Sequence, residues 1–358
     1  MLTPVETKWL TENYSFDKII LAGDIGGTNA NIGVVGRSGK DFALIMKSVF
    51  RTPDIVEFPE CLKTTLSEAQ KKIPELCPDL CCISGAGPVK DNYCRLSNSR
   101  CVIDGNEIEK ALGIRSLVIN DFSAISYALP LMDVNNPEQI TVLRHLDGSV
   151  SEQRGHVRAV AGAGTGMGVG FLIEKDGKYT AYPSEGGHIS FASFDEETRG
   201  FYNFMVSRVG ELTEAELFVC GGGIASAFDF FKEIKKIPME GVLAEIDKAP
   251  DTEKPAMISK HADDNSVCKE IFRFYVRMYG RFAGDVASLL IPTMGMYLGG
   301  GIVTKNERYF IEDDLFMRYF EDCYHPNIQK VLKGIPVYII KDYSVSLYGA
   351  ANAGCSLT

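Results

Sequence analysis

The chain has 358 residues, of which 45% are hydrophobic and 23% charged, which is ordinary for a globular protein and long enough for two domains. Its formal net charge of −10 argues against nucleic acid as the main partner, because phosphate contacts need lysine and arginine. No apolar run reaches the roughly 18 residues of a membrane span. The N-terminus lacks the basic start and apolar core of a secretory signal. We therefore expect a cytoplasmic protein with no membrane partner.

Ten cysteines are spread along the chain, and Cys77, Cys81 and Cys82 lie close together in it. A zinc site needs a second cysteine or histidine pair at ligand spacing, and none lies near these three residues. Cys81 and Cys82 also continue an apolar run into Ile83. Reduced, buried thiols in a cytosolic protein are therefore the favoured interpretation.

The N-terminal part begins with a polar extension, residues 1–17, which we interpret as a short helix. Residues 19–22 and 32–35 predict two strands joined by a turn of small and hydroxyl-bearing residues, namely Gly26, Gly27, Thr28 and Asn29. Asp24 stands at the end of the first strand, although aspartate is disfavoured in strands. An acid beside a turn that cradles phosphate suggests Mg²⁺ held through water. A plain hairpin turn is the alternative.

Asn120 and Asp121 follow the apolar residues 117–119, which predict a buried strand, and precede a helix that runs to Pro130. Polar side chains at the carboxyl end of a strand in an α/β sheet are where ligands meet the sheet. The alternative is that Asp121 simply caps the helix, but a cap alone does not need Asn120 beside it. We place a domain boundary near residue 132.

Glycine occupies every second position from Gly162 to Gly170, directly after an apolar run. Glycine weakens a strand, so this pattern marks a sharp turn or a close approach to the backbone. Bare N–H groups beside the hydroxyl group of Thr165 suit phosphate oxygens, whereas a hairpin turn packed under another strand is the plainer interpretation. The stretch repeats the design of residues 18–36, which predicts one phosphate turn in each half of the chain.

Glu185 and His188 flank two glycines, which places them on a tight turn rather than on a helix. A structural histidine and a solvated loop acid are the alternatives for these two residues. Glu216 precedes one triple glycine, and a second triple glycine at residues 299–301 follows a strand and can let a nucleoside lie against bare backbone. Other predicted elements are a strand at 44–50, helices at 54–72, 105–112, 196–209, 265–290 and 345–354, and a strand at 337–340.

Taken together, these stretches resemble ATP-dependent glucokinases of the bacterial type, also found in some protists, within the sugar kinase–Hsp70–actin superfamily. The motifs that carry the resemblance follow the family's order and cover nearly the whole chain: residues 23–29, 120–122, 162–168, 185–188, 216 and 299–306. The resemblance implies an α/β fold of the two-lobed, actin-like ATPase (ribonuclease H-like) type. Each lobe would be a mixed sheet flanked by helices, with a cleft between the lobes. The small lobe would comprise residues 1–132 plus 342–358, and the large lobe residues 133–341.

The resemblance also implies roles for individual residues. Asp24 would lie near Mg²⁺, bound through water, and the phosphates of ATP would contact Gly26, Gly27, Thr28, Asn29, Gly164, Thr165 and Gly166. The adenosine would lie against Gly299, Gly300 and Gly301. Glucose would be held by Asn98, Asn120, Asp121, Glu185, His188 and Glu216. Cys101 stands where the family commonly has a tryptophan, and the N-terminal extension is longer than usual.

The expected reaction moves the γ-phosphoryl group of ATP to the 6-hydroxyl group of glucose, with Asp121 as the general base. Closure of the lobes on glucose would exclude water, which competes as an acceptor. The alternatives are a kinase for another hexose or an N-acetylhexosamine, a different phosphate donor, and a non-catalytic sensor or Hsp70-like switch. No Gly-x4-Gly-Lys-Ser/Thr loop is present, so the chain is not a P-loop kinase. By resemblance we expect a homodimer.

Overall fold

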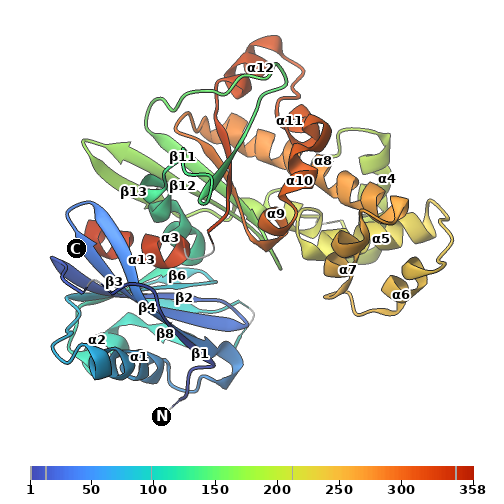
Figure 1. The fold of residues 1–358 in the computed structure, drawn as a ribbon. Coiled ribbons are helices and arrows are strands. Elements are labelled where there is room, and N and C mark those ends of the chain that lie inside the picture. The colour runs from blue at the N-terminus through green and yellow to red at the C-terminus, as the bar shows by residue number, and fades with distance from the viewer. Residues whose placement is uncertain (1, 13, 98, 212, 343–344) are drawn as a thin grey trace. The chain divides into compact units, whose positions relative to one another are not determined.

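The computed structural model describes residues 2–12, 14–97, 99–211, 213–342 and 345–358, and the chain divides into two compact units (Figure 1). The first unit comprises Met1–Asp133, Leu172–Pro183 and Asp342–Thr358, and the second comprises Val134–Phe171 and Ser184–Lys341. This division differs from the sequence-based one at residues 172–183. These residues contain the strand β13 (Lys178–Tyr182), which belongs to the first unit. Tyr179 and Ala181 of this strand pack in an apolar cluster that also contains residues of α3 (Asp121–Ala128) and α13 (Val345–Leu357).

The first unit is built on a six-stranded mixed sheet with the strand order β1-β4-β3-β2-β5-β9. Its strands are β1 (Glu6–Trp9), β2 (Lys18–Ile25), β3 (Asn29–Ser38), β4 (Asp41–Arg51), β5 (Leu80–Gly85) and β9 (Ser116–Asn120). β2, β5 and β9 are parallel to one another. Their carboxyl ends coincide, since Ile25 stands opposite Gly85 and Gly85 opposite Asn120. The polar residues predicted after two of these strands therefore lie at the same end of the sheet.

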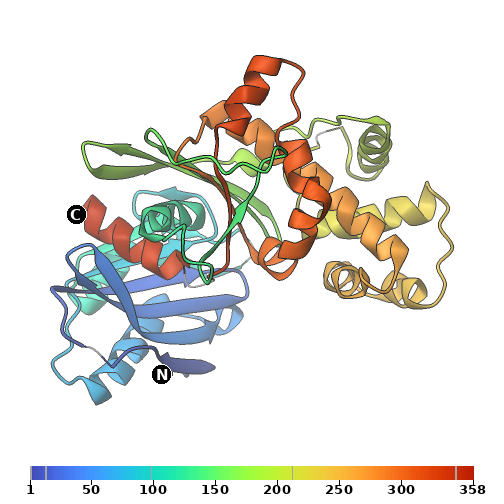
Figure 2. The same cartoon turned by 45° about the horizontal axis from the view of Figure 1, so that its top comes forward.

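Helices cover both faces of this sheet. Successive strand residues point to opposite faces, and Leu21 packs in the cluster that contains α1 (Phe58–Lys72) and α2 (Gly105–Leu112), whereas Ile20 packs in the cluster that contains α3 and α13. Figures 1 and 2 both show α3 and α13 side by side. The remaining elements of the unit are the 3₁₀ helices η1 (Thr52–Asp54) and η2 (Leu129–Leu131) and a small sheet of β6 (Val89–Lys90), β7 (Tyr93–Arg95) and β8 (Val102–Asp104).

The N-terminal extension forms a strand, so our interpretation of it as a short helix is wrong. β1 pairs antiparallel with β4, and Trp9 stands opposite Met46. The rings of Trp9 and Tyr14 meet edge to face, and the Lys72 ammonium group lies 4.6 Å from the centre of the Trp9 ring. These contacts join residues far apart in the chain, and a segment of four residues is too short to show a helical or strand period.

A second sheet, also of six strands, has the order β10-β15-β14-β11-β12-β13. Besides β13, its strands are β10 (Ile140–Leu143), β11 (Val157–Ala163), β12 (Met167–Lys175), β14 (Met296–Gly299) and β15 (Val337–Ile340). β14 is parallel to both β11 and β15, and Gly162 stands opposite Gly299. The glycine stretches at residues 162–170 and 299–301, both predicted to bind the nucleotide, therefore begin side by side in the sheet.

The predicted longest helix is confirmed as α8 (Ser266–Leu290), and the side chain of Asn265 caps it by accepting from two backbone N–H groups. Four of its apolar residues near helical spacing are buried: Ile271, Phe274, Met278 and Phe282. The other α-helices of the unit are α4 (Glu196–Val209), α5 (Gly221–Glu233), α6 (Val242–Lys248), α7 (Lys254–His261), α9 (Gly301–Lys305), α10 (Glu307–Ile311), α11 (Leu315–Phe320) and α12 (Pro326–Lys333). Its 3₁₀ helices are η3 (Gly186–His188), η4 (Ala215–Leu217) and η5 (Glu312–Asp314). Across the described ranges, no helix combines the length and apolar character that a membrane span requires.

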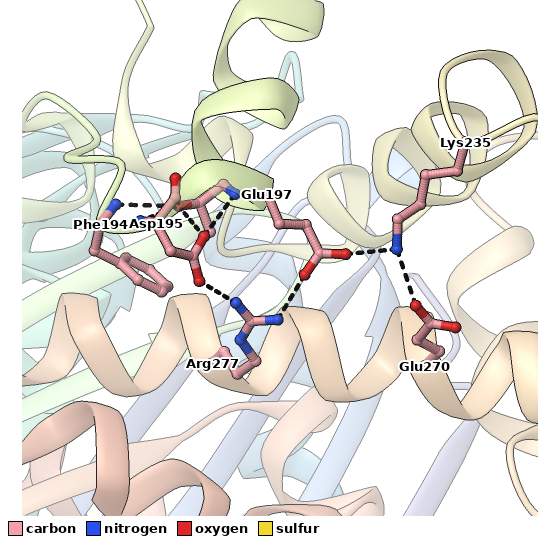
Figure 3. A network of polar contacts seen from close by, with 7 residues as sticks. Phe194, Asp195, Glu197, Lys235, Glu270 and Arg277 are labelled. Atoms are coloured by element: carbon pink, nitrogen blue, oxygen red, sulfur yellow. Dashed lines mark hydrogen bonds and ion pairs between the residues drawn. The ribbon is translucent and has the colours of Figure 1, made fainter.

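A chain of charged side chains links α4 and α8 (Figure 3). Arg277 of α8 pairs with Asp195, the N-cap of α4, and with Glu197, whose carboxylate lies 2.6 Å from it. Lys235 lies 2.5 Å from Glu197 and 2.9 Å from Glu270 of α8. Because Arg277 holds two carboxylates and is largely buried, with 19% of its side chain exposed, this network stabilises the packing of α4 on α8.

Arg277→Met should lower the free energy of unfolding by about 1–3 kcal/mol, because it removes the arginine that joins two partly buried carboxylates and leaves Glu197 with Lys235 alone. The measurement is chemical denaturation followed by circular dichroism. Arg154→Met is the matched control, because Arg154 pairs with Glu152 on the surface, where their side chains are 74% and 81% exposed. This variant should change the free energy of unfolding by no more than about 0.5 kcal/mol. Equal stabilities of the two variants would contradict the role of the network.

Candidate functional site

In the first unit, Asp24 lies near the carboxyl end of β2, as predicted. The hydroxyl group of Ser346 donates to its carboxylate at 2.7 Å. Burial raises the pKa of the Asp24 carboxyl group, while the hydrogen bond from Ser346 and the charge of Lys47 lower it. Burial disfavours the charged form of a carboxyl group, and a nearby cation favours that form. Asp24 therefore fits a cation bound beside it.

A magnesium ion at Asp24 would keep much of its water. In the parts of the chain that the structure describes, no group of three or more histidine, cysteine, aspartate or glutamate residues is arranged to hold a metal. Mg²⁺ is commonly bound by one or two carboxylates together with waters and substrate phosphates, rather than by a full protein cage. The single carboxylate of Asp24 fits this kind of binding, in which the phosphates supply the other ligands.

The turn from β2 to β3 exposes Thr28 and Asn29. The N–H group of Gly26 donates to the Asn29 carbonyl at 2.9 Å, which closes the turn. Buried Thr52 braces it, because its hydroxyl group donates to the Gly26 carbonyl at 2.7 Å and its N–H group to the Thr28 carbonyl at 2.9 Å. We did not identify Thr52 from the sequence, since it lies 26 residues from its partner.

Asn120 is the N-cap of α3, so the argument that a cap would not need it is wrong. Its side-chain oxygen accepts from the N–H groups of Phe122 and Ser123 at 2.9 and 3.2 Å, and its amide donates to the Gly87 carbonyl at 3.2 Å. Asp121 is the first residue of α3, and its partly exposed carboxylate accepts from the Phe122 N–H group at 3.0 Å. The cap position thus belongs to Asn120 rather than to Asp121.

Asp24 and Asp121 lie at the same end of the first sheet. The strand β5 runs between β2 and β9, so the chain at Asp24 and at Asn120 is separated by about two strand spacings, roughly 10 Å. The first unit therefore brings together the two acids on which its predicted chemistry depends.

Asn98, the remaining predicted residue of this unit, lies outside the described residues. Three positions later in the sequence, burial raises the pKa of the Cys101 thiol to about 11. Burial and the charge of Asp121 raise the pKa of Cys94 to about 11. None of the ten cysteines forms a disulfide here, and seven of them are buried, including Cys81 and Cys82 as predicted, whereas Cys77 is exposed. Cys94 and Cys101 are therefore unreactive at neutral pH.

In the second unit, β11 and β12 form the predicted hairpin. The N–H group of Gly164 donates to the Gly166 carbonyl at 2.9 Å, and Thr165 between them is exposed. The helix α5 begins against this turn, because the Gly221 N–H group donates to the Gly164 carbonyl at 2.9 Å. Gly300 follows the neighbouring β14 with a φ of +91°, and a Cβ atom there would lie 2.3 Å from the Ala163 carbonyl oxygen. Only glycine fits at that position.

Glu216, which we assigned to the sugar alone, also binds the hairpin. Its carboxylate accepts from the Met167 N–H group at 2.9 Å, where β12 begins. A Cβ atom on Gly166 would lie 2.5 Å from the same carboxylate oxygen, so the glycine allows the approach. Glu216 therefore fixes the hairpin that carries the predicted phosphate turn.

Glu185 and His188 lie on a tight turn that contains η3, as predicted. The turn packs directly on β12, because a Cβ atom on Gly187 would lie 1.8 Å from the Met167 carbonyl oxygen. The side chains of Glu185 and His188 are 70% and 46% exposed, which argues against a buried structural histidine. Glu185, His188 and Glu216 are thus gathered around the first residue of β12.

Glu214 is a further residue of this group that we did not identify from the sequence. Its carboxylate lies 2.6 Å from His188 Nδ1, and Glu185 lies 4.0 Å from Nε2 of the same ring. The hydrogen bond to Glu214 raises the pKa of His188, burial lowers it, and the charges of Glu216 and Glu185 raise it. The available signal was its position two residues before Glu216 in the same short segment.

Each unit by itself presents groups that suit phosphate and hydroxyl ligands. The first has two carboxylates beside a glycine turn, and the second has bare backbone N–H groups beside a histidine and three glutamates. Backbone N–H groups bind phosphate oxygens, and carboxylates accept from hydroxyl groups. This chemistry suits ligands that carry phosphate and hydroxyl groups.

Comparisons with known proteins agree with this chemistry. The family model described as Glucokinase matches residues 21–356. The glucokinase of Helicobacter acinonychis is 31% identical over 337 residues, which cover 93% of this chain and 94% of that protein. The crystal structure of a glucokinase from an Antarctic psychrotroph superposes with a TM-score of 0.77 at 25% identity, covering 94% of this chain and 99% of the other. A glucokinase of the ROK family from Streptomyces griseus, solved with glucose and AMPPNP, shares the fold with a TM-score of 0.63 at 20% identity, covering 94% and 99% of the two chains.

Gly187→Ala should destabilise the protein by about 1–3 kcal/mol, because the added methyl group would overlap the Met167 carbonyl and push the turn off β12. The measurement is the melting temperature. The matched control is Gly200→Ala in α4, where a Cβ atom would meet its nearest neighbour at 3.5 Å, an ordinary contact. That variant should be stabilised by about 0.5–1 kcal/mol, since alanine favours a helix over glycine. A Gly187→Ala protein as stable as the control would contradict the close packing of the turn.

Proposed function

Because the chain belongs to the glucokinase family, we propose that it transfers the γ-phosphoryl group of ATP to the 6-hydroxyl group of glucose, with Asp121 as the general base. The observation that carries this proposal is the position of Asp121 at the start of α3, where Asn120 already provides the cap. A partly exposed carboxylate at this position can accept a proton from a sugar hydroxyl group bound within hydrogen-bonding distance.

The phosphates of ATP would bind to both glycine turns. In the first unit, the exposed Thr28 and Asn29 would contact them, together with Gly26 and Gly27. In the second unit, Gly164, Thr165 and Gly166 would contact the phosphates, with the exposed Thr165 offering a backbone N–H group and a hydroxyl group; the Gly164 N–H group closes the turn instead. Gly299, Gly300 and Gly301 would lie against the adenosine, and the close contact of Gly300 with Ala163 supports a backbone surface there without side chains.

Asp24 would hold Mg²⁺ through water. When bound, the ion supplies positive charge that neutralises the phosphate oxygens during transfer. The raised pKa of the Asp24 carboxyl group supports this assignment, because a nearby cation favours the charged carboxylate. The hydrogen bond from Ser346 would keep the carboxylate oriented while the phosphates bind.

Glucose would be bound by the side chains of Asn98, Asn120, Asp121, Glu185, His188 and Glu216. A site that bonds each hydroxyl group rejects sugars that lack one, because buried polar groups are then left without partners. As the 6-hydroxyl oxygen attacks the γ-phosphorus atom, Asp121 would accept the hydroxyl proton. Positioning and charge neutralisation would supply most of the rate, as in other phosphoryl transfers.

We also propose that the protein is a cytoplasmic homodimer. Its ten free cysteines suit a reducing compartment in which ATP is available. The dimer rests on the family resemblance alone, and sedimentation equilibrium would test it through the mass of the particle in solution.

The function itself is tested by a panel of acceptors and donors. With ATP and Mg²⁺, glucose should be phosphorylated with the highest kcat/KM, ahead of mannose, fructose and N-acetylglucosamine. With glucose as the acceptor, ATP should exceed ADP and polyphosphate. Faster phosphorylation of another sugar, or no transfer to any of them, would contradict the proposed function.

Asp121→Asn should keep the affinity for glucose and ATP but lower kcat by about 10²–10⁴-fold, because the amide cannot accept the hydroxyl proton. A coupled assay for glucose 6-phosphate measures the rate, and calorimetry measures both affinities. Glu75→Gln, which removes an exposed acid of the same unit, should change neither quantity. Near-normal turnover by Asp121→Asn would remove Asp121 from the role of general base.

A further inference from the structure

The turn that carries His188 is fastened to the segment that carries Glu214. Ser190 and Glu214 form an antiparallel bridge, and the Ala215 N–H group donates to the Ile189 carbonyl at 2.7 Å. The Phe191 N–H group also donates to the Thr213 carbonyl, at 3.4 Å. These backbone bonds set the distance between the two side chains, so their contact does not depend on two freely moving surface groups.

The contact fixes how the imidazole ring is used. His188 Nδ1 lies 2.6 Å from the Glu214 carboxylate, and an ionised carboxylate only accepts hydrogen bonds. Nδ1 must therefore carry the proton of that bond. Nε2 is then the ring atom left for a ligand, and its nearest charged neighbour in the described residues is Glu185, at 4.0 Å.

We propose that Glu214 is a positioning residue for the sugar, which holds the imidazole of His188 so that Nε2 bonds a hydroxyl group of glucose. This inference rests on the proposed function, which makes His188 a sugar contact, and it adds a residue that was not among the predicted ones. Fixing a ring through the hydrogen bond of its other nitrogen is the same device that orients histidine ligands in metal sites.

Glu214 also sets the charge of the ring. Three carboxylates face His188: Glu214 and Glu216 from the segment of η4, and Glu185 from its own turn. They raise the pKa of His188, with the Glu214 hydrogen bond as the largest cause. Below that pKa, Nε2 carries a proton and donates to a sugar oxygen. As the pH rises through the raised pKa, this donor is lost, so glucose affinity should fall.

Two variants separate position from charge. In Glu214→Gln, the amide oxygen can still accept from Nδ1, but the negative charge is gone. Its glucose affinity should match the unsubstituted protein on the acid side, and the pH at which affinity falls should be lower. In Glu214→Ala both effects are lost, so the dissociation constant of glucose should rise about three- to tenfold at every pH. The KM for glucose should rise in parallel while kcat changes by about twofold or less.

The readout that does not depend on activity is the titration of His188 itself. Proton NMR follows the ring signals of the five histidines, and the signal missing from His188→Asn identifies His188. In Glu214→Gln the midpoint of that signal should move to lower pH. Glu211→Gln removes an equal charge from an exposed residue of the same loop, and it should leave both the midpoint and glucose binding unchanged.

Different results would contradict the role of Glu214 and the proposed function. If Glu214→Ala keeps its melting temperature, and its glucose binding and His188 titration superimpose on those of the unsubstituted protein, the inference is wrong even though glucose is phosphorylated. If the unsubstituted protein does not bind or phosphorylate glucose, the proposed function fails, although the NMR titration would still show whether Glu214 holds His188. A loss of glucose affinity without any change in the pH profile would also overturn the part assigned to charge.

Discussion

The predicted phosphate and sugar residues of the second unit are held in place by close contacts with the backbone of Met167, the first residue of β12. The carboxylate of Glu216 binds its N–H group, and the turn with Gly187 lies against its carbonyl oxygen. The phosphate turn at residues 164–166 begins where these contacts end. Glycine is required at residue 187, because a Cβ atom there would lie 1.8 Å from the Met167 carbonyl oxygen and push the turn off the strand. The groups proposed for phosphate and for sugar are therefore held by one strand, so a displacement of either would disturb the other.

The first unit obtains its arrangement from parallel strands that end together. β2 and β9 each pair in parallel with β5, and this pairing brings Asp24 and Asp121, which are far apart in the sequence, to the same end of the sheet. Asn120 caps α3, and Asp121 follows it as the first residue of the helix. Thr52, at the end of β4, holds the turn between β2 and β3 through two hydrogen bonds. A buried hydroxyl group and a cap thus support the residues that would meet the substrates.

Much of this could be predicted from the sequence, because the informative patterns are local. Glycine at alternate positions predicted the hairpin of β11 and β12, and the helices predicted at residues 105–112 and 265–290 agree with α2 and α8. The parts that were missed are contacts between distant residues: β1 with β4, Thr52 with Gly26, and Glu214 with His188. Local propensity carries no information on such partners, since each side chain alone is an ordinary strand, loop or surface residue. Asn120 was misjudged for another reason, because its neighbour Asp121 is also a good capping residue.

The account's central claim is that the chain joins the γ-phosphoryl group of ATP to the oxygen on carbon 6 of glucose. The most direct measurement is NMR of the reaction with glucose labelled with carbon-13 at that carbon. The account predicts that the carbon-6 signal becomes split by coupling to phosphorus and that each labelled product consumes one ATP. A phosphoryl group on another carbon, or conversion of ATP to inorganic phosphate with the sugar unchanged, would contradict it.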